Sequence, residues 1–241
     1  MAKSHYLEGH LGFNIARGLV KGADFIHKFG AVPAMSQSQT GTVWDKNDTI
    51  YPWSAFDTAG ILVAAQANVS DNGKTVTVFG LDADYLPISE EFTLSGTGTV
   101  NGTKIFKRVY RAYMSDGSNV ADVSFSRGGT EILRITAGKS QTQMAIYTVP
   151  AGYTAYMMKG TATCQAGADA TGDMFIRYYG QSSFRVGHSF EVAGTGGQYL
   201  YEFASPIPIP GKSDIDIRTS VRSNNARITA AFDIILVETG V

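Results

Sequence analysis

The sequence predicts an all-β protein whose body is a β-sandwich or jelly roll, in one or two sandwiches, and three observations favour this class. Thr, Val and Ile are plentiful beside 12 Tyr and 13 Phe, and such side chains fit the pleated surface of a sheet. The 27 Gly supply tight turns between short strands. About a dozen short apolar or alternating segments recur at regular spacing, which is typical of sandwiches and jelly rolls.

The first 57 residues differ from the rest, and we expect residues 1–57 to form a largely irregular N-terminal arm. Their glycines oppose a helix, since each costs up to about 1 kcal/mol relative to Ala. The segment has little predicted structure of its own, so its large aromatic side chains need another surface to pack against. We therefore expect the arm to pack on a neighbouring subunit or back on its own domain. The candidate subunit-interface residues are Phe13, Phe25, Phe29, Trp44, Tyr51 and Trp53.

Residues 58–149 are expected to form a first sandwich portion. Residues 61–65 have the continuous apolar character of a buried strand. Asn72 and Gly73 suit a two-residue hairpin turn, because both positions tolerate positive φ. Residues 75–80 then alternate polar and apolar side chains. Further strands are expected at 92–97, 106–114, 120–126, 132–136 and 144–149.

Residues 150–241 are expected to form a second sandwich portion, after a break at Pro150. The stretch 206–210 should be stiff and extended, because its alternate prolines lack a backbone donor. Residues 214–218 have a strict period of two, so their isoleucines should face a core. Strands are expected at 154–163, 173–179, 184–192, 198–204, 214–221 and 227–237.

Composition restricts the partners and the compartment. Charged residues make up 17% of the chain, below the roughly 25% usual for soluble domains, so we expect much of the surface to be covered by other chains. A net charge of -1 indicates neither nucleic acid nor an anionic membrane as a partner. The chain lacks both a run of ~20 apolar residues and a signal-peptide pattern, so we expect synthesis and use in a cytoplasm. The single cysteine, Cys164, excludes an intrachain disulfide and is expected to serve packing.

No catalytic constellation is present in the sequence, so we expect a protein that is not an enzyme and that holds no cofactor or metal. It has no nucleophile elbow, Walker loop or zinc-protease motif. Asp82 and Asp84 lack the Gly and Glu spacing of a calcium loop, which favours a turn with capped backbone amides. Glu90 and Glu91 point to opposite faces of a strand and are expected to be solvent-exposed. The histidines are not at metal-ligand spacing with Cys or carboxylates: His5, His10, His27 and His188.

One group of aromatic residues leaves a second interpretation open. Tyr178, Tyr179, Phe184, Tyr199 and Tyr201 could form a platform that stacks on sugar rings. Alternation along a strand puts Tyr199 and Tyr201 on the same face, which suits a sugar platform and equally a sandwich core with interface anchors. The core and interface interpretation is favoured.

A series of short motifs runs between residues 65 and 156. They are Val-x-Val-x-Gly-Leu-Asp at 76–82, a strand ending in Thr-Leu-x-Gly-Thr at 91–97, Phe-x-Arg-Val at 106–109, Gly-Ser-Asn-x-x-Asp-Val at 117–123, and Ala-Gly-x-x-Gln-Thr leading to Ile-Tyr-Thr-Val-Pro-Ala-Gly-x-Thr-Ala-Tyr at 137–156. This series resembles a family of virion structural proteins of tailed phages, particularly those of aquatic bacteria (the cyanophage type). The resemblance implies a location in the virion, after assembly in the host cytoplasm. The motif glycines are expected at sharp turns: Gly80, Gly96, Gly117 and Gly152.

The resemblance leaves the position within the particle open. The leading expectation is a capsid decoration, or cement, protein that bridges capsid subunits and stabilises the head by burying surface across their joints. Its partners would be the major capsid protein or other virion proteins, and it would be a homotrimer. The alternative is a tail, baseplate or fibre component, and a glycan-binding module of the virion is a further one. Neither nucleic acid nor a membrane is expected as a partner.

Overall fold

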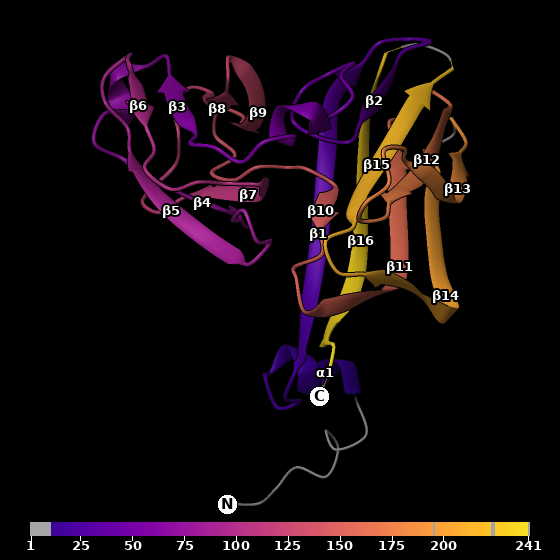
Figure 1. Cartoon of the computed structure of the whole chain (residues 1–241). Helices are drawn as coiled ribbons and strands as arrows, with labels where there is room; N and C mark the ends of the chain where they lie inside the picture. The colour runs from indigo at the N-terminus through magenta and orange to yellow at the C-terminus, as the bar shows by residue number, and fades with distance from the viewer. Residues whose placement is uncertain (1–10, 195, 223–224, 241) are drawn as a thin grey trace, which may run out of the picture.

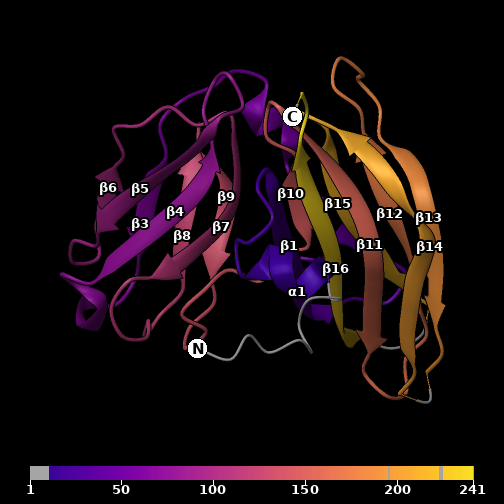
Figure 2. The same ribbon diagram turned by 90° about the horizontal axis from the view of Figure 1, so that it is seen from below.

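The computed structural model describes residues 11–194, 196–222 and 225–240, and it consists of two β-sandwiches that lie side by side (Figures 1 and 2). A short helix, α1 (Leu11–Ala16), precedes the first strand. No helix in these three ranges is long and apolar enough to cross a membrane. The prediction of an all-β protein of the sandwich type is confirmed.

One of the two sandwiches is a jelly roll. Numbered along the chain, its eight main strands have the order 1-8-3-6 in one sheet and 2-7-4-5 in the other, and all neighbours are antiparallel. Every connection except the hairpin between the fourth and fifth strands therefore passes from one sheet to the other, as in two Greek keys. The short β2 (Thr40–Thr42) pairs with β15 beyond the end of β10. The first sheet holds β1 (Ala23–Met35), β16 (Ala226–Glu238), β11 (Tyr153–Cys164) and β14 (Gln198–Pro210), and the second holds β10 (Ile146–Thr148), β15 (Asp214–Val221), β12 (Ala170–Arg177) and β13 (Arg185–Val192).

The other sandwich is inserted between β2 and β10 of the jelly roll. It lies beside β1 and β10, while β13 and β14 form the opposite edge of the molecule (Figures 1 and 2). Two short 3-10 helices, η2 (Trp53–Phe56) and η3 (Val69–Asp71), flank its first strand. One of its sheets has the strand order β6 (Thr99–Asn101), β3 (Val63–Gln66), β8 (Val123–Arg127) and β9 (Thr130–Ile135). The other has the order β5 (Pro87–Thr93), β4 (Thr75–Leu81) and β7 (Arg108–Met114).

The stretch expected to be an irregular arm contributes a main strand of the jelly roll. β1 pairs with β16 from Ala23 opposite Val237 to Met35 opposite Ala226. The apolar alternation that would have revealed this strand is interrupted by Lys28, which is only 8% exposed, and by Gly30. The jelly roll therefore takes strands from both ends of the chain, and the division into an arm at 1–57 and consecutive portions at 58–149 and 150–241 does not describe its strand order.

Each sandwich has its own apolar core. Ile215 and Ile217 of β15 are buried in the jelly-roll core, as their period predicts. Asp214 and Asp216, which alternate with these isoleucines along the strand, are also buried, although the same period would place them in solvent. The reason is that the inserted sandwich covers the outer face of β15.

Candidate functional site at the junction of the two sandwiches

Two buried carboxylates of β15 lie where the sandwiches meet. Asp214 is 2% exposed and Asp216 is fully buried. Their side chains alternate with the isoleucines that fill the jelly-roll core, so they point away from that core and towards the inserted sandwich. Burying a carboxylate is costly unless charged or hydrogen-bonding partners surround it, and both have such partners.

Asp214 joins one arginine from each sandwich. Arg108 of β7 donates from Nε to Oδ1 at 2.8 Å and from Nη2 to Oδ2 at 3.1 Å. Arg177, at the end of β12, donates to Oδ2 at 3.0 and 2.6 Å. The hydroxyl of Thr148 completes the set at 2.7 Å. This shared carboxylate is a buried electrostatic link between two separately formed cores.

Asp216 extends the same network. It accepts hydrogen bonds from Trp53 Nε1 at 2.9 Å, Thr42 Oγ1 at 2.8 Å and Arg218 Nε at 2.8 Å. Burial raises the pKa of this carboxyl above its ordinary value, against the opposing influence of the Arg218 charge and the hydrogen bonds.

Aromatic rings enclose the arginines of this network. The Arg108 guanidinium carbon lies 5.7 Å from the Trp53 ring centroid. That of Arg177 lies 5.5 Å from Trp53 and 4.7 Å from Phe184. Such cation–π contacts stabilise a desolvated cation without adding another charge. The sequence alone marks Trp53 and Phe184 as candidate aromatics but gives no sign of the two arginines and two aspartates, because no local signal marks a charge that a distant segment will bury.

The six candidate interface residues fall into two groups. Trp44, Tyr51 and Trp53 are each at most 5% exposed and belong to the core of the inserted sandwich. These three residues therefore pack on their own chain, which is the second of the two arrangements expected for the arm. Phe13 and Phe25 are 47% and 42% exposed on the surface, and Phe29 is half-buried.

Two leucines near the N-terminal end of the described chain are exposed like Phe13 and Phe25. Leu11 and Leu19 are 63% and 61% exposed. We call Leu11, Phe13, Leu19 and Phe25 the N-terminal patch. It lies where α1 meets the start of β1, at the end of the jelly roll away from the β1–β2 connection (Figure 1).

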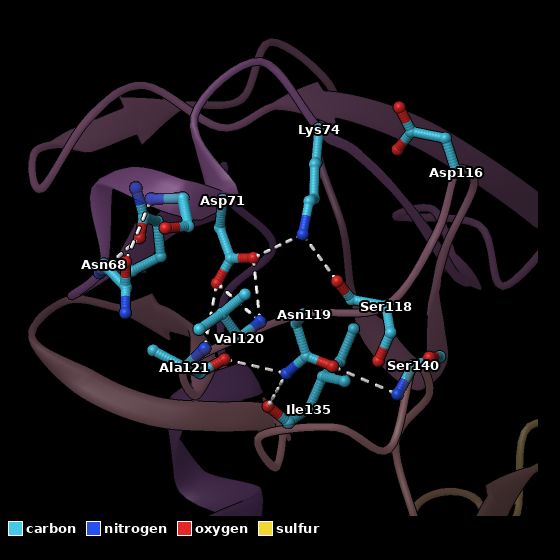
Figure 3. Close-up of polar contacts among 12 residues, drawn as sticks. Asn68, Asp71, Lys74, Asp116, Ser118, Asn119, Val120, Ala121, Ile135 and Ser140 are labelled. Atoms are coloured by element: carbon cyan, nitrogen blue, oxygen red, sulfur yellow. Dashed lines mark hydrogen bonds and ion pairs between the residues drawn. The ribbon is translucent and has the colours of Figure 1, made fainter.

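A second polar cluster explains the Gly-Ser-Asn-x-x-Asp-Val motif (Figure 3). Asp71, which is fully buried, accepts hydrogen bonds from the backbone N–H groups of Val120 and Ala121 at 2.8 and 2.9 Å, and from Lys74 Nζ at 2.8 Å. Burial alone would raise the pKa of Asp71, but these hydrogen bonds outweigh it and the pKa is lowered.

Asn119 holds the same loop from its other side (Figure 3). Its amide nitrogen donates to the carbonyls of Ala121 and Ile135 at 2.8 and 3.0 Å, and its oxygen accepts from Ser140 N at 3.1 Å. The cluster fixes the β7–β8 and β9–β10 connections through these hydrogen bonds. The motif residues at this point therefore define the fold.

Asp71→Asn is expected to lower the free energy of unfolding by about 2 kcal/mol at pH 7, because bonds to a buried charge are replaced by weaker ones. A lowered folded-state pKa means that the unfolded chain binds more protons, so the contribution is full above the ordinary pKa near 3.8 and is lost as the pH falls below it. Urea titrations between pH 7 and pH 3 measure both effects. The exposed Asp84→Asn is the control, and a wild-type acid dependence in Asp71→Asn would contradict the assignment.

The aromatics of the sugar-platform interpretation are divided between two places. Phe184 packs against Trp53 at the junction, where Tyr178 and Tyr179 also lie, and the Tyr179 ring centroid is 5.8 Å from that of Tyr85. Tyr199 and Tyr201 share a face of β14, as predicted, with parallel rings 6.4 Å apart beside His188. The five aromatics therefore do not form one surface.

The remaining candidates have structural environments. Asp82 Oδ1 accepts from the N–H groups of Asp84 and Leu86 at 2.9 Å, which confirms the capped turn. Glu90 was expected in solvent, but it is 8% exposed and accepts from Thr103 N, so that prediction was wrong. Cys164 is buried, as predicted for packing. The described residues hold no group of three or more His, Cys, Asp or Glu side chains that could bind a metal, and His5 and His10 lie outside them.

Comparisons with known proteins leave the family open. No protein-family model matches the chain, and no curated protein matches it. Among solved structures it is similar to infectious bursal disease virus, Gt strain, with 12% identity over 91% of this chain and 73% of that one and a TM-score of 0.24. Cowpea mosaic virus empty particles match with 5% identity over 76% and 85%, TM-score 0.24, and broad bean stain virus with 10% over 76% and 87%, TM-score 0.22. Similarities this weak carry no argument about function, and the jelly roll is established by the strand order of the chain itself.

Proposed function

We propose that the protein is a non-enzymatic structural component of a tailed-phage virion, attached to the head as a capsid decoration (cement) protein. Three features support the proposal. The motifs between residues 65 and 156 resemble virion structural proteins of tailed phages, which supports a location in the particle without choosing between head and tail. The buried ion network at Asp214 makes one unit of two sandwiches, which suits a part that must transmit force. The N-terminal patch offers apolar surface for attachment.

The exposure of the N-terminal patch is the observation that carries the proposal. Four large apolar side chains, each between 42% and 63% exposed, gather within residues 11–25. Apolar side chains of this size are the ones that contribute most when an interface buries them. A cement protein stabilises a head by covering such surface across a joint between capsid subunits, so we infer that the patch contacts the major capsid protein.

Heads stripped of the protein provide the test. Phe13→Asp combined with Leu19→Asp is expected to weaken rebinding at least about tenfold in a co-sedimentation assay, because each change places a charge in the interface. The control is Val69→Asp, which changes a side chain that is 69% exposed on the inserted sandwich. Full-affinity binding by the double variant, or immunogold label at the tail alone, would contradict the cement role.

A deletion designed from the structure must stop before β1. Removing residues 1–21 leaves the paired strand Ala23–Met35 intact, whereas removing 1–57 takes away an edge strand of the jelly roll. We also infer a homotrimer that associates through the free edge formed by β13 and β14, where Val186 and Leu200 are each 54% exposed. Analytical ultracentrifugation should give three times the mass of one chain, and a monomer at high concentration would exclude this.

A further inference from the structure

A cleft of about 460 Å³ opens at the junction of the two sandwiches. One wall is formed by η2, by the β4–β5 turn at Tyr85 and by the start of β7. The facing wall is formed by residues 178–182, which connect β12 to β13, and by the β14–β15 turn at Lys212. The volume lies in the range of roughly 300–1,000 Å³ that is usual for sites of small ligands.

The cleft carries an excess of positive charge. Four cations line it against two carboxylates, namely Lys107, Arg108, Arg177 and Lys212 against Asp57 and Asp214. Asp214 is already bound by both arginines. No ion pair to Lys212 is formed within the described residues, and Lys107 Nζ donates to the carbonyl oxygen of Asp57 at 2.8 Å. Partial burial, together with the neighbouring Arg108 charge, lowers the pKa of Lys107, against the opposing charges of Asp57 and Asp214.

Two residues that line the cleft adopt a backbone conformation that is unfavourable for their type. Tyr85 has φ of 67° and Lys212 has φ of 65°. Non-glycine residues in this region are strained, and they concentrate where a side chain must be aimed at a ligand. Both are held in place by backbone bonds, from Ala151 N to the Tyr85 carbonyl at 2.9 Å and from Lys212 N to the Val149 carbonyl at 2.7 Å. The main chain that carries both side chains is thus held at the cleft by the fold.

The side chains at this point combine a cation with aromatic faces. Lys212 Nζ lies 5.0 Å from the ring centroid of Tyr179 and 5.7 Å from that of Tyr85. The two rings meet edge to face, at an interplanar angle of 81°. Tyr179 remains 60% exposed, so much of its side chain is open to a ligand. Gln181 and Ser182 add hydrogen-bonding groups to the lining.

We propose that this cleft binds an acidic sugar unit, with its carboxylate at Lys212 and Lys107 and its ring on Tyr179. The exposed aromatic ring suits the apolar face of a sugar ring, and the amide and hydroxyl groups of residues 181 and 182 suit its hydroxyls. An acidic peptide fits less well. Peptides are commonly held by a free strand edge or an apolar helix groove, whereas the backbone N–H groups of Tyr85 and Lys212 are already paired. The site is independent of attachment through the N-terminal patch.

Titration of the isolated full-length protein with sodium glucuronate tests the proposal, with binding followed by saturation-transfer NMR. We expect saturable binding with Kd on the order of 1 mM, and binding of glucose and of sodium acetate at least about tenfold weaker. Lys212→Asn removes the charge but keeps a residue that tolerates positive φ. Tyr179→Ala removes the exposed ring. Each variant should weaken glucuronate binding at least about tenfold, while the matched surface variant Lys139→Gln should not change it.

Several results would overturn the site. They are the absence of saturable glucuronate binding, wild-type affinity in either Lys212→Asn or Tyr179→Ala, and tighter binding of inorganic phosphate or of a hexaglutamate peptide than of glucuronate. Far-ultraviolet circular dichroism of both variants establishes that they are folded. No capsid is present in the glucuronate titration, so a negative result there would not contradict attachment to the head. A negative result in the rebinding assay would likewise not contradict the sugar site.

Discussion

Asp214→Asn is expected to destabilise the protein by about 3–5 kcal/mol. The change leaves Arg108 and Arg177, whose side chains are 7% and 16% exposed, without their shared anion. Removing one partner of a buried ion pair costs this much because the remaining charge has lost both its water and its counterion. Here two charges are left in that state. Equilibrium unfolding in urea, followed by tryptophan fluorescence, measures the loss.

An exposed ion pair gives the matched control for this experiment. Glu191 and Arg222 lie 3.3 Å apart with side chains that are 74% and 64% exposed. Glu191→Gln should change the free energy of unfolding by less than about 1 kcal/mol, because solvent screens the pair. Similar losses in the two variants would mean that the Asp214 network does not link the sandwiches in the way its geometry indicates.

Gly30→Ala is expected to cost about 3 kcal/mol, the second large effect. A Cβ at this position of β1 would overlap the carbonyl oxygen of Val43 and the backbone nitrogen of Ala145, and would lie 3.0 Å from Ala145 Cβ. Those two backbone atoms form a hydrogen bond of 2.8 Å where the chain leaves for the inserted sandwich and returns from it. Neither can move without opening the junction, so overpacking at this point is costly.

Gly160→Ala is the control for a glycine in a strand. No atom lies within 4 Å of a Cβ built on Gly160 in β11. This substitution should change stability by less than about 1 kcal/mol and can be stabilising, because alanine restricts the unfolded chain. Thermal unfolding of both variants measures the difference. Equal melting temperatures for Gly30→Ala and the wild type would show that β1 does not pack as described.

Local sequence patterns predicted the class of the protein and many of its strands. The alternation at 75–80 lies within β4, and the period of two at 214–218 lies within β15. Gly117 has the positive φ that its turn requires. Gly80 was expected at a sharp turn as well, but it lies inside β4, where a Cβ would overlap the Arg108 carbonyl. That glycine reflects the close approach of another strand, which no local pattern reports.

The sequence by itself determined that the chain forms strands joined by glycine-rich turns, because the direction of successive side chains depends only on neighbouring residues. Only the tertiary structure decided how those strands are shared between two sandwiches. The pairing of β1 with β16 joins Ala23 to Val237, near opposite ends of the chain, and no local period encodes such a partner. No local period predicts the burial of Asp214 and Asp216 either, because their alternation with isoleucines is typical of the exposed face of a strand. They are buried, and link the two sandwiches, because the inserted sandwich docks on that face.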